Sequence, residues 1–254
     1  MVNIKLLSQK NIIIMKTKCT IVVPCYNEGK RLKCEDFSQF IKKHQEFIFL
    51  FINDGSTDNT GFILKTFCSN HSNVTFLELN KNYGKAEAIR LGILHIIHRN
   101  PITPFIGFCD ADLATPLNEL HAMLNLTNDN TLFISGCRIK RLGSTITRKA
   151  TRHILGRIFA TAVSLHLNLP IYDTQCGAKI YNSSFIAKVF QKPFVTKWFF
   201  DVEILRRLIT IYGKKYVIDN SLEYPLQCWI EKTGSKINFY TALTDFIKLL
   251  FTKD

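Results

Sequence analysis

The sequence has no apolar run long enough to cross a membrane. A transmembrane helix needs about 20 predominantly apolar residues, and no stretch here reaches ~18 without a charged side chain. Within residues 1–18 the apolar core is only Ile12-Ile13-Ile14-Met15, and no small-residue cleavage site accompanies it. A signal peptide needs a longer apolar region than this. We therefore expect neither a transmembrane helix nor a signal peptide, and either Met1 or Met15 can be the native start.

Proline, glycine and clustered cysteines are also scarce. Only 7 Pro and 12 Gly occur in 254 residues, of which 46% are apolar, and this composition excludes a disordered or fibrous chain. The 8 cysteines include no C-x-x-C pair, which disfavours structural zinc. Several lie inside apolar runs, as small buried side chains do. We expect a folded α/β protein of one domain, with or without a C-terminal extension, in a reducing compartment.

The sequence also lacks the features that are typical of dinucleotide oxidoreductases and of nucleic-acid-binding proteins. No Gly-x-Gly-x-x-Gly follows the first predicted strand, which disfavours a dinucleotide oxidoreductase. The net charge of +13 implies an anionic partner, namely nucleic acid, a membrane surface or a phosphorylated ligand. Between Arg138 and Arg157 there are seven basic residues, no acidic residue and no aromatic residue. Nucleic-acid-binding proteins interleave aromatic with basic side chains, so we expect no nucleic-acid partner.

Four apolar runs predict buried parallel strands, each followed by a polar loop. A helix predicted over residues 86–99 gives strand–helix–strand spacing, which is typical of βαβ units. Ser56 or Thr57 is expected to cap the helix after the second strand. Ligands of such sheets bind beyond the carboxyl ends of the strands, so the loops are expected to share one edge. The predicted strands are residues 19–24, 47–52, 74–79 and 104–109.

Two carboxylates, Asp110 and Asp112, directly follow the fourth predicted strand. In a strand, residues i and i+2 point to the same side, so both side chains can converge on one cation. Mg²⁺ is commonly held by few carboxylates together with substrate phosphates. The pattern predicts a Mg²⁺ or Mn²⁺ site, with a solvated turn as the alternative.

The second half of the chain combines charge with apolar surface. The basic segment 138–157 precedes an uncharged, largely apolar segment, residues 158–172. This combination suits a lipid-phosphate acceptor at an anionic membrane; a solvated basic face followed by a core helix over 158–169 is the alternative. The tail, residues 237–251, has apolar side chains at helical spacing and predicts an amphipathic helix that packs on the domain or on lipid.

Several motifs, taken together, resemble family-two inverting glycosyltransferases of the GT-A fold. Downstream motifs resemble the dolichyl-phosphate β-glucosyltransferases and bacterial polyprenyl-phosphate relatives, and the resemblance covers roughly residues 19–240. Two departures are Lys197, where Arg is usual, and the absence of spanning segments. The Gln-x-x-Arg-Trp signature of processive synthases is missing, which disfavours a polymerase. The motifs that resemble family two as a whole are Pro24-x-Tyr26-Asn27-Glu28, Asp54-Gly55-Ser56-x-Asp58, Asn82-x-Gly84-Lys85-x-x-Ala88 and Asp110-x-Asp112. The downstream motifs that resemble the polyprenyl-phosphate subgroup are Gly136-Cys137-Arg138, Asp173 to Lys179, Lys197 to Glu203 and Gly234-Ser235-Lys236.

The resemblance implies an α/β GT-A domain over residues 19–236, with a mostly parallel sheet flanked by helices. Residues 1–18 would be an N-terminal extension and 237–254 an amphipathic helix. It also implies roles for individual residues. Catalysis is expected from Asp110, Asp112 and Asp201; donor binding from Pro24, Tyr26, Glu28, Asp54, Lys85 and Asp110; acceptor-phosphate binding from Arg138, Arg148, Arg152, Lys179 and Lys236; and metal binding from Asp110 and Asp112.

The implied reaction is metal-dependent transfer of a hexose, expected to be glucose, from a UDP-sugar to a polyprenyl or dolichyl phosphate with inversion. We expect a peripheral protein at the cytoplasmic face of a membrane. The alternative acceptor is a saccharide hydroxyl, for which Asp201 or Glu203 would act as general base. A phosphate acceptor, whose second pKa is about 6, needs no base, and the pair would then organise the basic groups.

Three donor-site residues have a structural alternative. Asp54 would accept a hydrogen bond from the base imide, or it would only cap a turn. Glu28 would contact the nucleotide, or it would only begin a helix. Lys85 follows Gly84 in a loop, so its ammonium would reach the diphosphate or remain solvated.

Overall fold

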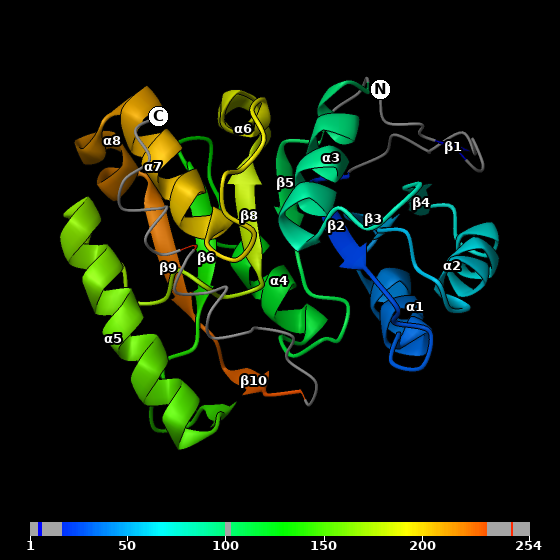
Figure 1. Cartoon of the computed structure of the whole chain (residues 1–254), viewed down its shortest axis with the longest axis horizontal. Helices are drawn as coiled ribbons and strands as arrows, with labels where there is room; N and C mark the ends of the chain where they lie inside the picture. The colour runs from blue at the N-terminus through cyan, green and yellow to red at the C-terminus, as the bar shows by residue number, and fades with distance from the viewer. Residues whose placement is uncertain (1–4, 7–16, 100–102, 233–244, 246–254) are drawn as a thin grey trace. The chain divides into compact units, whose positions relative to one another are not determined.

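The computed structural model describes residues 5–6, 17–99, 103–232 and 245. The chain forms two compact units. Unit 1 comprises Met1–Leu113 and Tyr181–Pro193, and unit 2 comprises Ala114–Ile180 and Phe194–Asp254. The chain passes from unit 2 to unit 1 within strand β8 (Lys179–Asn182). Figure 1 shows strands and helices alternating along the chain, and the predicted α/β class with a mostly parallel sheet is confirmed.

Unit 1 carries the strand order β1-β4-β3-β2-β5. The pairs β2–β3, β3–β4 and β2–β5 are parallel, whereas β1 pairs with β4 in the antiparallel sense. The four predicted strands of this unit agree with the observed ones at nearly every residue. The strands are β1 (Lys5–Leu6), β2 (Cys19–Cys25), β3 (Phe47–Asn53), β4 (Val74–Glu78) and β5 (Phe105–Phe108).

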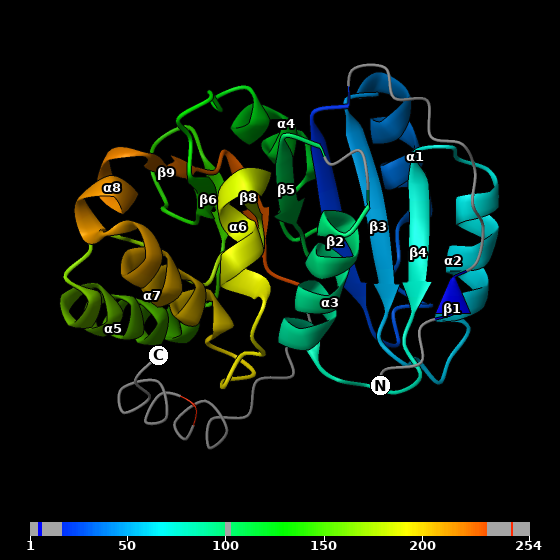
Figure 2. The ribbon, with the colours of Figure 1, turned by 90° about the horizontal axis from the view of Figure 1, so that it is seen from above.

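The core of unit 1 is built on both faces of β3, whose seven residues are all buried. On one face, the ring of Phe37 lies 5.0 Å from that of Phe51, and Phe67 lies 5.8 Å from Phe51. On the other face, Gly92 lets α3 approach so closely that a Cβ there would lie 3.0 Å from Cδ1 of Ile52. Figure 2 shows α1 and α2 on one side of these strands and α3 on the other. The helices are α1 (Cys34–Lys43), α2 (Thr60–Ser69), α3 (Lys85–Ile97) and α6 (Ser183–Phe190).

Unit 2 contains two parallel strand pairs, β6–β9 and β7–β10. Strand β6 ends immediately before Arg138. Helix α7 begins at Phe200, so the predicted acidic pair lies in its first turn. The elements are α4 (Leu117–Leu124), β6 (Phe133–Cys137), β7 (Thr145–Thr147), α5 (Ala150–Leu167), α7 (Phe200–Tyr212), α8 (Lys214–Asp219), β9 (Ser221–Pro225) and β10 (Cys228–Ile230).

The alternative prediction, a core helix over residues 158–169, is wrong, because helix α5 lies on the surface. It buries only Ala160, Val163 and Leu167, and its large aliphatic residues outside this set are exposed. The apolar stretch therefore forms a surface helix that rests on unit 2 along a narrow face. Among the described residues, no helix combines the length and hydropathy that crossing a membrane requires.

The expected cap of α2 is wrong. The helix begins at Thr60, and it is Asp58 whose Oδ1 accepts the Thr60 N–H at 3.0 Å. Ser56 and Thr57 instead bond to the neighbouring loop, because they lie too far ahead of the first helical turn.

The predicted C-terminal helix lies outside the described residues except for Asp245, and the domain boundaries at 18 and 236 stay predictions. Asp245 is buried, and its Oδ2 accepts the N–H groups of Lys197 and Trp198 at 3.0 and 3.2 Å. At this one residue, the tail is anchored to unit 2. All eight cysteines are free, and six are buried, as expected for reduced apolar thiols.

Candidate active site

The loops that follow β2 and β3 are locked together. Asn27 has a positive φ of 54°, donates its N–H to Oγ of Ser56 at 3.0 Å and accepts the Thr57 N–H at 2.9 Å. The Glu28 N–H donates to Oγ1 of Thr60 at 2.9 Å. Because each loop satisfies the other's backbone groups, the two carboxyl-end loops form one rigid surface.

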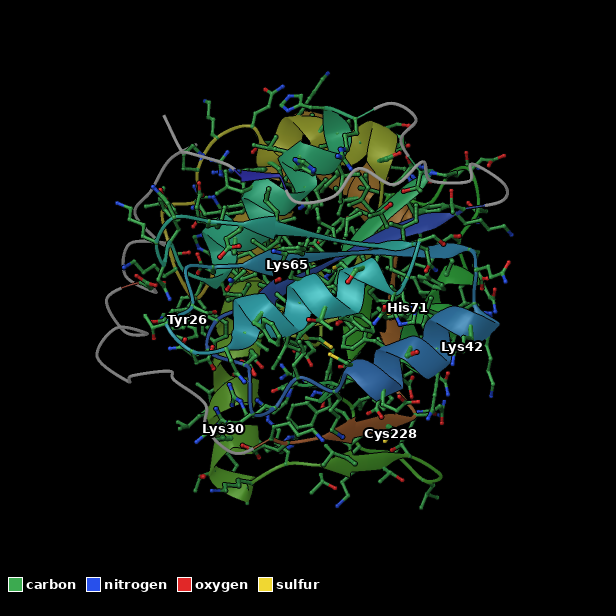
Figure 3. All side chains as sticks on the ribbon, turned by 90° about the vertical axis from the view of Figure 1, so that its right-hand side faces the viewer. Tyr26, Lys30, Lys42, Lys65, His71 and Cys228 are labelled. Carbon is green, nitrogen blue, oxygen red and sulfur yellow. The ribbon has the colours of Figure 1, made fainter. Side chains whose placement is uncertain are left out.

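This surface carries the predicted donor residues Pro24, Tyr26 and Glu28, all of which are half-buried. Figure 3 shows Tyr26 at the end of unit 1 where α2 begins, with His71 and Lys42 at the opposite end. The Glu28 carboxylate forms an ion pair with Arg31 at 2.6 Å. The structure thus gives Glu28 a local partner and leaves its predicted nucleotide contact untested.

Asp54 ties these loops to the segment that precedes α3. Its carboxylate is 2% exposed, and it accepts the N–H groups of Tyr83 and Gly84, both at 2.8 Å. Burial raises the pKa of Asp54, and the two N–H donors oppose that rise. Gly55 has a φ of +64°, and a Cβ there would lie 2.3 Å from the Lys81 carbonyl carbon. Only glycine therefore permits this approach, which places Lys85 at the start of α3.

Asp110 and Asp112 lie at a turn rather than in a strand. Strand β5 ends at Phe108, and Leu113, with a φ of 52°, donates its N–H to the Asp110 carbonyl oxygen at 3.3 Å. Strand alternation, the basis of the sequence prediction, is therefore not what places the two carboxylates. Asp110 forms an ion pair with Lys85, and both of these side chains are about one third exposed, at 35% and 37%.

This donor set suits a hard divalent cation. Two half-exposed carboxylates supply oxygen ligands of the kind that Mg²⁺ and Mn²⁺ accept. The Lys85 ammonium on Asp110 demonstrates that a positive charge is accommodated at this carboxylate. Burial, together with the charges of Asp110 and Asp112, raises the pKa of the adjacent Cys109 thiol.

In unit 2, Arg138 follows β6 and is held by Asp173. Its Nε donates to Oδ2 at 2.7 Å, its Nη2 donates to Oδ1 at 2.8 Å, and its backbone N–H adds a third bond at 3.0 Å. The guanidinium also lies 5.2 Å from the ring centroid of Trp229. Burial alone would raise the pKa of Asp173, but the charge and hydrogen bonds of Arg138 outweigh it and hold that pKa well below its ordinary value.

Glu223, a residue of β9, holds the backbone at Asp173 in place. Its carboxylate accepts the N–H groups of Tyr172 and Asp173 at 2.6 and 2.7 Å. Burial raises the pKa of Glu223, and the two N–H donors oppose that rise. Asp173 is thereby fixed in backbone as well as side chain, and the orientation of Arg138 depends on both carboxylates.

Of two further predicted arginines, Arg148 lies within electrostatic range of both Arg138 and Arg152. Arg152 forms an ion pair with Glu231, whose other oxygen accepts the Lys149 N–H at 2.8 Å. Burial, and then the positive charges of Arg138 and Arg152, lower the pKa of Arg148. We define these three arginines as the arginine cluster. Arg138 and Arg152 both repel the positive charge of Arg148, so an anion bound at Arg148 is favoured.

Lys179 and Asp201 are buried, with exposures of 2% and 6%. The Lys179 ammonium donates to Oδ1 of Asp201 at 2.6 Å and to the carbonyl oxygens of Thr174 and Cys176 at 3.0 and 2.8 Å. These contacts fix the loop between Asp173 and Lys179. The predicted acceptor contact of Lys179 and the general-base role of Asp201 stay predictions, and Lys236 lies outside the described residues.

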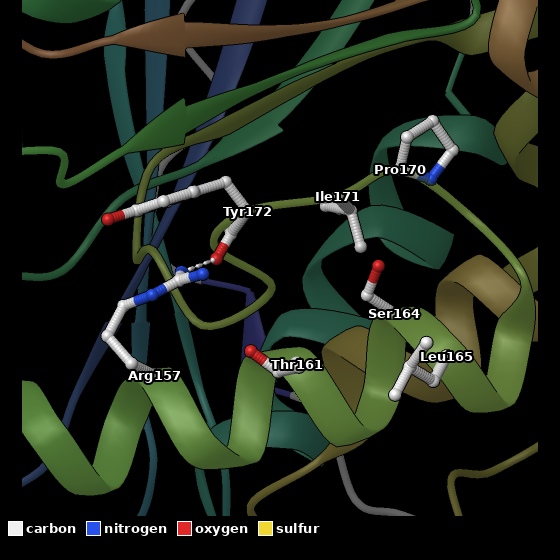
Figure 4. A pocket seen from close by; sticks show the side chains of 7 residues that line it. All are labelled: Arg157, Thr161, Ser164, Leu165, Pro170, Ile171 and Tyr172. Atoms are coloured by element: carbon white, nitrogen blue, oxygen red, sulfur yellow. Dashed lines mark hydrogen bonds between the residues drawn. The ribbon is translucent and has the colours of Figure 1, made fainter.

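A hollow of about 300 Å³ opens between α5 and the segment that precedes the Asp173 loop. Arg157 stacks on Tyr172 with its guanidinium carbon 3.4 Å from the ring centroid, and it donates to the Tyr172 carbonyl oxygen at 2.5 Å. Figure 4 shows Arg157 and Tyr172 on one side of the hollow and Leu165, Pro170 and Ile171 on the other. The hollow thus has one cationic and one apolar side.

The sequence profile described as Glycosyl transferase family 2 matches residues 20–190. The chain belongs to glycosyltransferase family 2. Its similar relatives include the dolichyl-phosphate beta-glucosyltransferase of Saccharomyces cerevisiae, 30% identical over 240 residues, which cover 86% of this chain and 68% of that one. The dolichyl-phosphate beta-glucosyltransferase of Homo sapiens is 29% identical over 252 residues, covering 92% of this chain and 74% of that one. The predicted family and its glycosyltransferase class are confirmed.

Solved structures of similar fold support the GT-A architecture of this family 2 glycosyltransferase. A mannosyltransferase from Pyrobaculum calidifontis, solved with GDP-Man and Mn²⁺, has a TM-score of 0.63 at 15% identity and covers 95% of this chain and 66% of that one. Glucosyl-3-phosphoglycerate synthase from Mycobacterium tuberculosis, solved with Mn²⁺, UDP and phosphoglyceric acid, has a TM-score of 0.64 at 14% identity, with coverages of 94% and 80%. This chain therefore spans about two thirds to four fifths of the length of these proteins.

Sequence reasoning gave no role to several residues that position the family 2 site. The pairing of Asn27 with the loop after β3 had a local signal, since Asn adopts positive φ more readily than most residues. Asp173 lay in a recognised motif but received no role. Glu223 and Glu231 had no signal, because their partners lie 50 and 79 residues away in sequence.

Proposed function

We propose that this family 2 glycosyltransferase transfers a hexose, glucose in the first instance, from a UDP-sugar to a polyprenyl or dolichyl phosphate with inversion. The donor would be held by the locked loops of unit 1 and the acceptor phosphate by the arginine cluster of unit 2. The observation that carries the proposal is that cluster, in which Arg138 pairs with Asp173, Arg152 pairs with Glu231, and both positive charges act on the half-buried Arg148. The names of the relatives support the same acceptor.

A divalent cation held by Asp110 and Asp112 would neutralise the charge that develops on the leaving diphosphate. The chain's own contribution begins with Asp54, which fixes the loop before Lys85 through two backbone bonds. Lys85 then offers an ammonium beside the same carboxylates and adds positive charge where the diphosphate would lie. Mg²⁺ and Mn²⁺ both fit this oxygen-rich set.

In the proposed reaction, an acceptor phosphate oxygen attacks the anomeric carbon, the bond from that carbon to the diphosphate oxygen breaks, and UDP leaves. A phosphate monoester, with a second pKa of about 6, is already anionic at neutral pH, so no proton need be removed. Arginine suits this acceptor because its five N–H donors allow one guanidinium to pair with a carboxylate, as Arg138 does with Asp173, and still donate to a phosphate oxygen. Thr174 Oγ1 and Gln175 Nε2 are buried without a hydrogen-bond partner among the described residues, and they would add further polar contacts.

Transfer to a saccharide hydroxyl is the weaker alternative. It needs a general base, and the predicted base Asp201 is buried and bonded to Lys179 at 2.6 Å. A carboxylate that stabilises a buried ammonium cannot readily accept a proton, because protonation would leave that ammonium unpaired. We therefore assign Asp201 a positioning role.

The test has a donor arm and an acceptor arm. The purified protein is incubated with Mg²⁺ or Mn²⁺ and labelled UDP-glucose or GDP-mannose, and hydrolysis and transfer are measured. Acceptors are dolichyl phosphate, undecaprenyl phosphate, the matching alcohols and free saccharides. We expect transfer from UDP-glucose to the phosphates alone. Transfer to an alcohol or saccharide, with none to a phosphate, would refute the acceptor, and preference for GDP-mannose would refute the donor.

We further propose that the protein works as a peripheral protein at the cytoplasmic face of a membrane, where a polyprenyl phosphate would be met. The lipid acceptor and the basic surface of unit 2 support this location.

A further inference from the structure

Helix α5 has an outer face that is unusual for a helix on a protein surface. Four large aliphatic side chains on it are exposed by 58% to 76%, and they are Ile154, Leu155, Ile158 and Leu165. Ile154, Ile158 and Leu165 are spaced so that they fall on one side of the helix, opposite the buried Val163 and Leu167. The remaining exposed positions of residues 150–165 are Ala150, Thr151 and Thr161, which are also uncharged. We call this surface the α5 face.

A surface helix that packs one side on its domain normally turns charged residues outward. The α5 face instead presents a contiguous aliphatic stripe, which monomeric soluble proteins rarely expose without a partner. The charged residues of the helix, Arg152 and Arg157, are half-buried and engaged with Glu231 and Tyr172. The outward side is therefore suited to an apolar environment.

The basic segment that precedes α5 indicates which kind of partner the α5 face binds. The seven basic residues between Arg138 and Arg157 have no acidic residue among them, and Lys140, Arg141 and Lys149 are exposed. Leu142, between Arg141 and Gly143, is 100% exposed. An aliphatic stripe on a helix that directly follows an exposed basic segment matches the interface of a bilayer with anionic headgroups, where apolar side chains enter the acyl boundary and cations remain among phosphates.

We propose that the α5 face docks the protein onto an anionic membrane surface. This deepens the proposed function, because a membrane-docked α5 would bring the hollow at Arg157 and Leu165 to the layer in which a polyprenyl phosphate resides. A second copy of the chain is the disfavoured occupant, since α5 carries no acidic residue that would complement the basic residues of another copy.

The central test is vesicle co-sedimentation of the full chain, without any sugar donor. Vesicles contain phosphatidylcholine alone or phosphatidylcholine with phosphatidylglycerol. The variant Ile154→Gln/Leu155→Gln/Ile158→Gln removes three of the four exposed aliphatic side chains and leaves Leu165, which lines the hollow, unchanged. All three replaced side chains are exposed, so the fold should persist. The matched control is Phe62→Gln on α2 of unit 1, because Phe62 is comparably exposed at 73%.

We expect the wild type to bind the mixed vesicles more tightly than the neutral ones, and salt to weaken this preference. The triple variant should lose about tenfold or more in affinity, because partial burial of three aliphatic side chains contributes at least that factor. Phe62→Gln should bind as the wild type does. Tryptophan placed by Leu165→Trp should shift its emission to the blue on vesicle addition, whereas Phe62→Trp should not.

Unchanged vesicle binding by the triple variant would overturn the proposal, as would absence of binding by the wild type. A wild-type dimer in sedimentation velocity that the triple variant dissociates would assign the α5 face to a second copy and overturn it equally. The outcome is separable from the proposed function, because transfer to a detergent-solubilised polyprenyl phosphate is measured without a bilayer. The triple variant should retain that transfer.

Discussion

Removing the Asp173 carboxylate charge should destabilise unit 2 and disorder the arginine cluster. Asp173 is 7% exposed and accepts three bonds from Arg138 at 2.7 to 3.0 Å. Breaking a buried ion pair by removing one partner costs about 3–5 kcal/mol, because the other charge stays buried without compensation. For a chain of this size, each kcal/mol shifts Tm by roughly 2–4 °C. Asp173→Asn should therefore lower Tm by about 6–20 °C.

The pH dependence gives an independent signature of the same pair. The folded-state pKa of Asp173 lies below its unfolded value of 3.8. The carboxylate therefore contributes stability above that value, and this contribution is lost as the pH falls through the folded pKa. The Tm difference between wild type and Asp173→Asn should be full near neutral pH and should shrink as the pH is lowered below about 4.

The assay is thermal unfolding followed by circular dichroism across pH, with Asp219→Asn as the control. Asp219 also pairs with a basic residue, Lys215 at 2.7 Å, but this pair is exposed, so its loss should leave Tm nearly unchanged. The double variant Asp173→Asn/Arg138→Met should be more stable than the sum of the single effects predicts, because neither charge is then left buried alone. A pH-independent Tm difference, or additive single effects, would refute the argument.

Three further variants test the site. Asp112→Asn should abolish metal-dependent turnover with Tm unchanged, because this half-buried turn residue adds little to the core; full Mg²⁺- or Mn²⁺-dependent turnover would refute its role as a ligand. Asp54→Ala should weaken binding of UDP about tenfold or more, and more than binding of bare diphosphate, since a buried charge-assisted bond contributes about 1.5–3 kcal/mol; equal losses measured by calorimetry would reassign Asp54 to the loop contacts at Tyr83 and Gly84. Arg138→Lys should lower kcat/KM for the phosphate acceptor about tenfold, because lysine cannot keep the two bonds to Asp173 and also offer a fixed N–H to the phosphate; an unchanged value would remove Arg138 from the acceptor site.

The strands of unit 1 could be predicted because continuous apolar runs such as Phe47 to Ile52 encode strands buried on both faces. The expectation that the loops share one edge of the sheet followed from the same βαβ logic. Motif spacing then indicated the family correctly. These are local features, and each is written in a few consecutive residues.

The features that could not be predicted from the sequence depend on local backbone geometry without a sequence signal or on contacts between distant residues. The placement of Asp110 and Asp112 by a turn depends on the positive φ at Leu113, which has no clear local signal. Helix α2 begins after Asn59, with Asp58 accepting the Thr60 N–H, so Ser56 and Thr57 lie too far ahead to cap it and bond to Asn27 in the neighbouring loop instead. The exposure of the α5 face could not be predicted either, because the same apolar residues are compatible with a buried core helix and with a surface helix.

The central claim is that a hexose passes from a UDP-sugar to a lipid-linked phosphate with inversion. The most direct measurement isolates the product formed from UDP-glucose and dolichyl phosphate and determines its mass and anomeric configuration by mass spectrometry and NMR. The account predicts a glucosyl phosphodiester of dolichol in the β configuration, formed only when Mg²⁺ or Mn²⁺ is present. A product with retained α configuration, or a glucoside of a hydroxyl group in place of the phosphodiester, would contradict it.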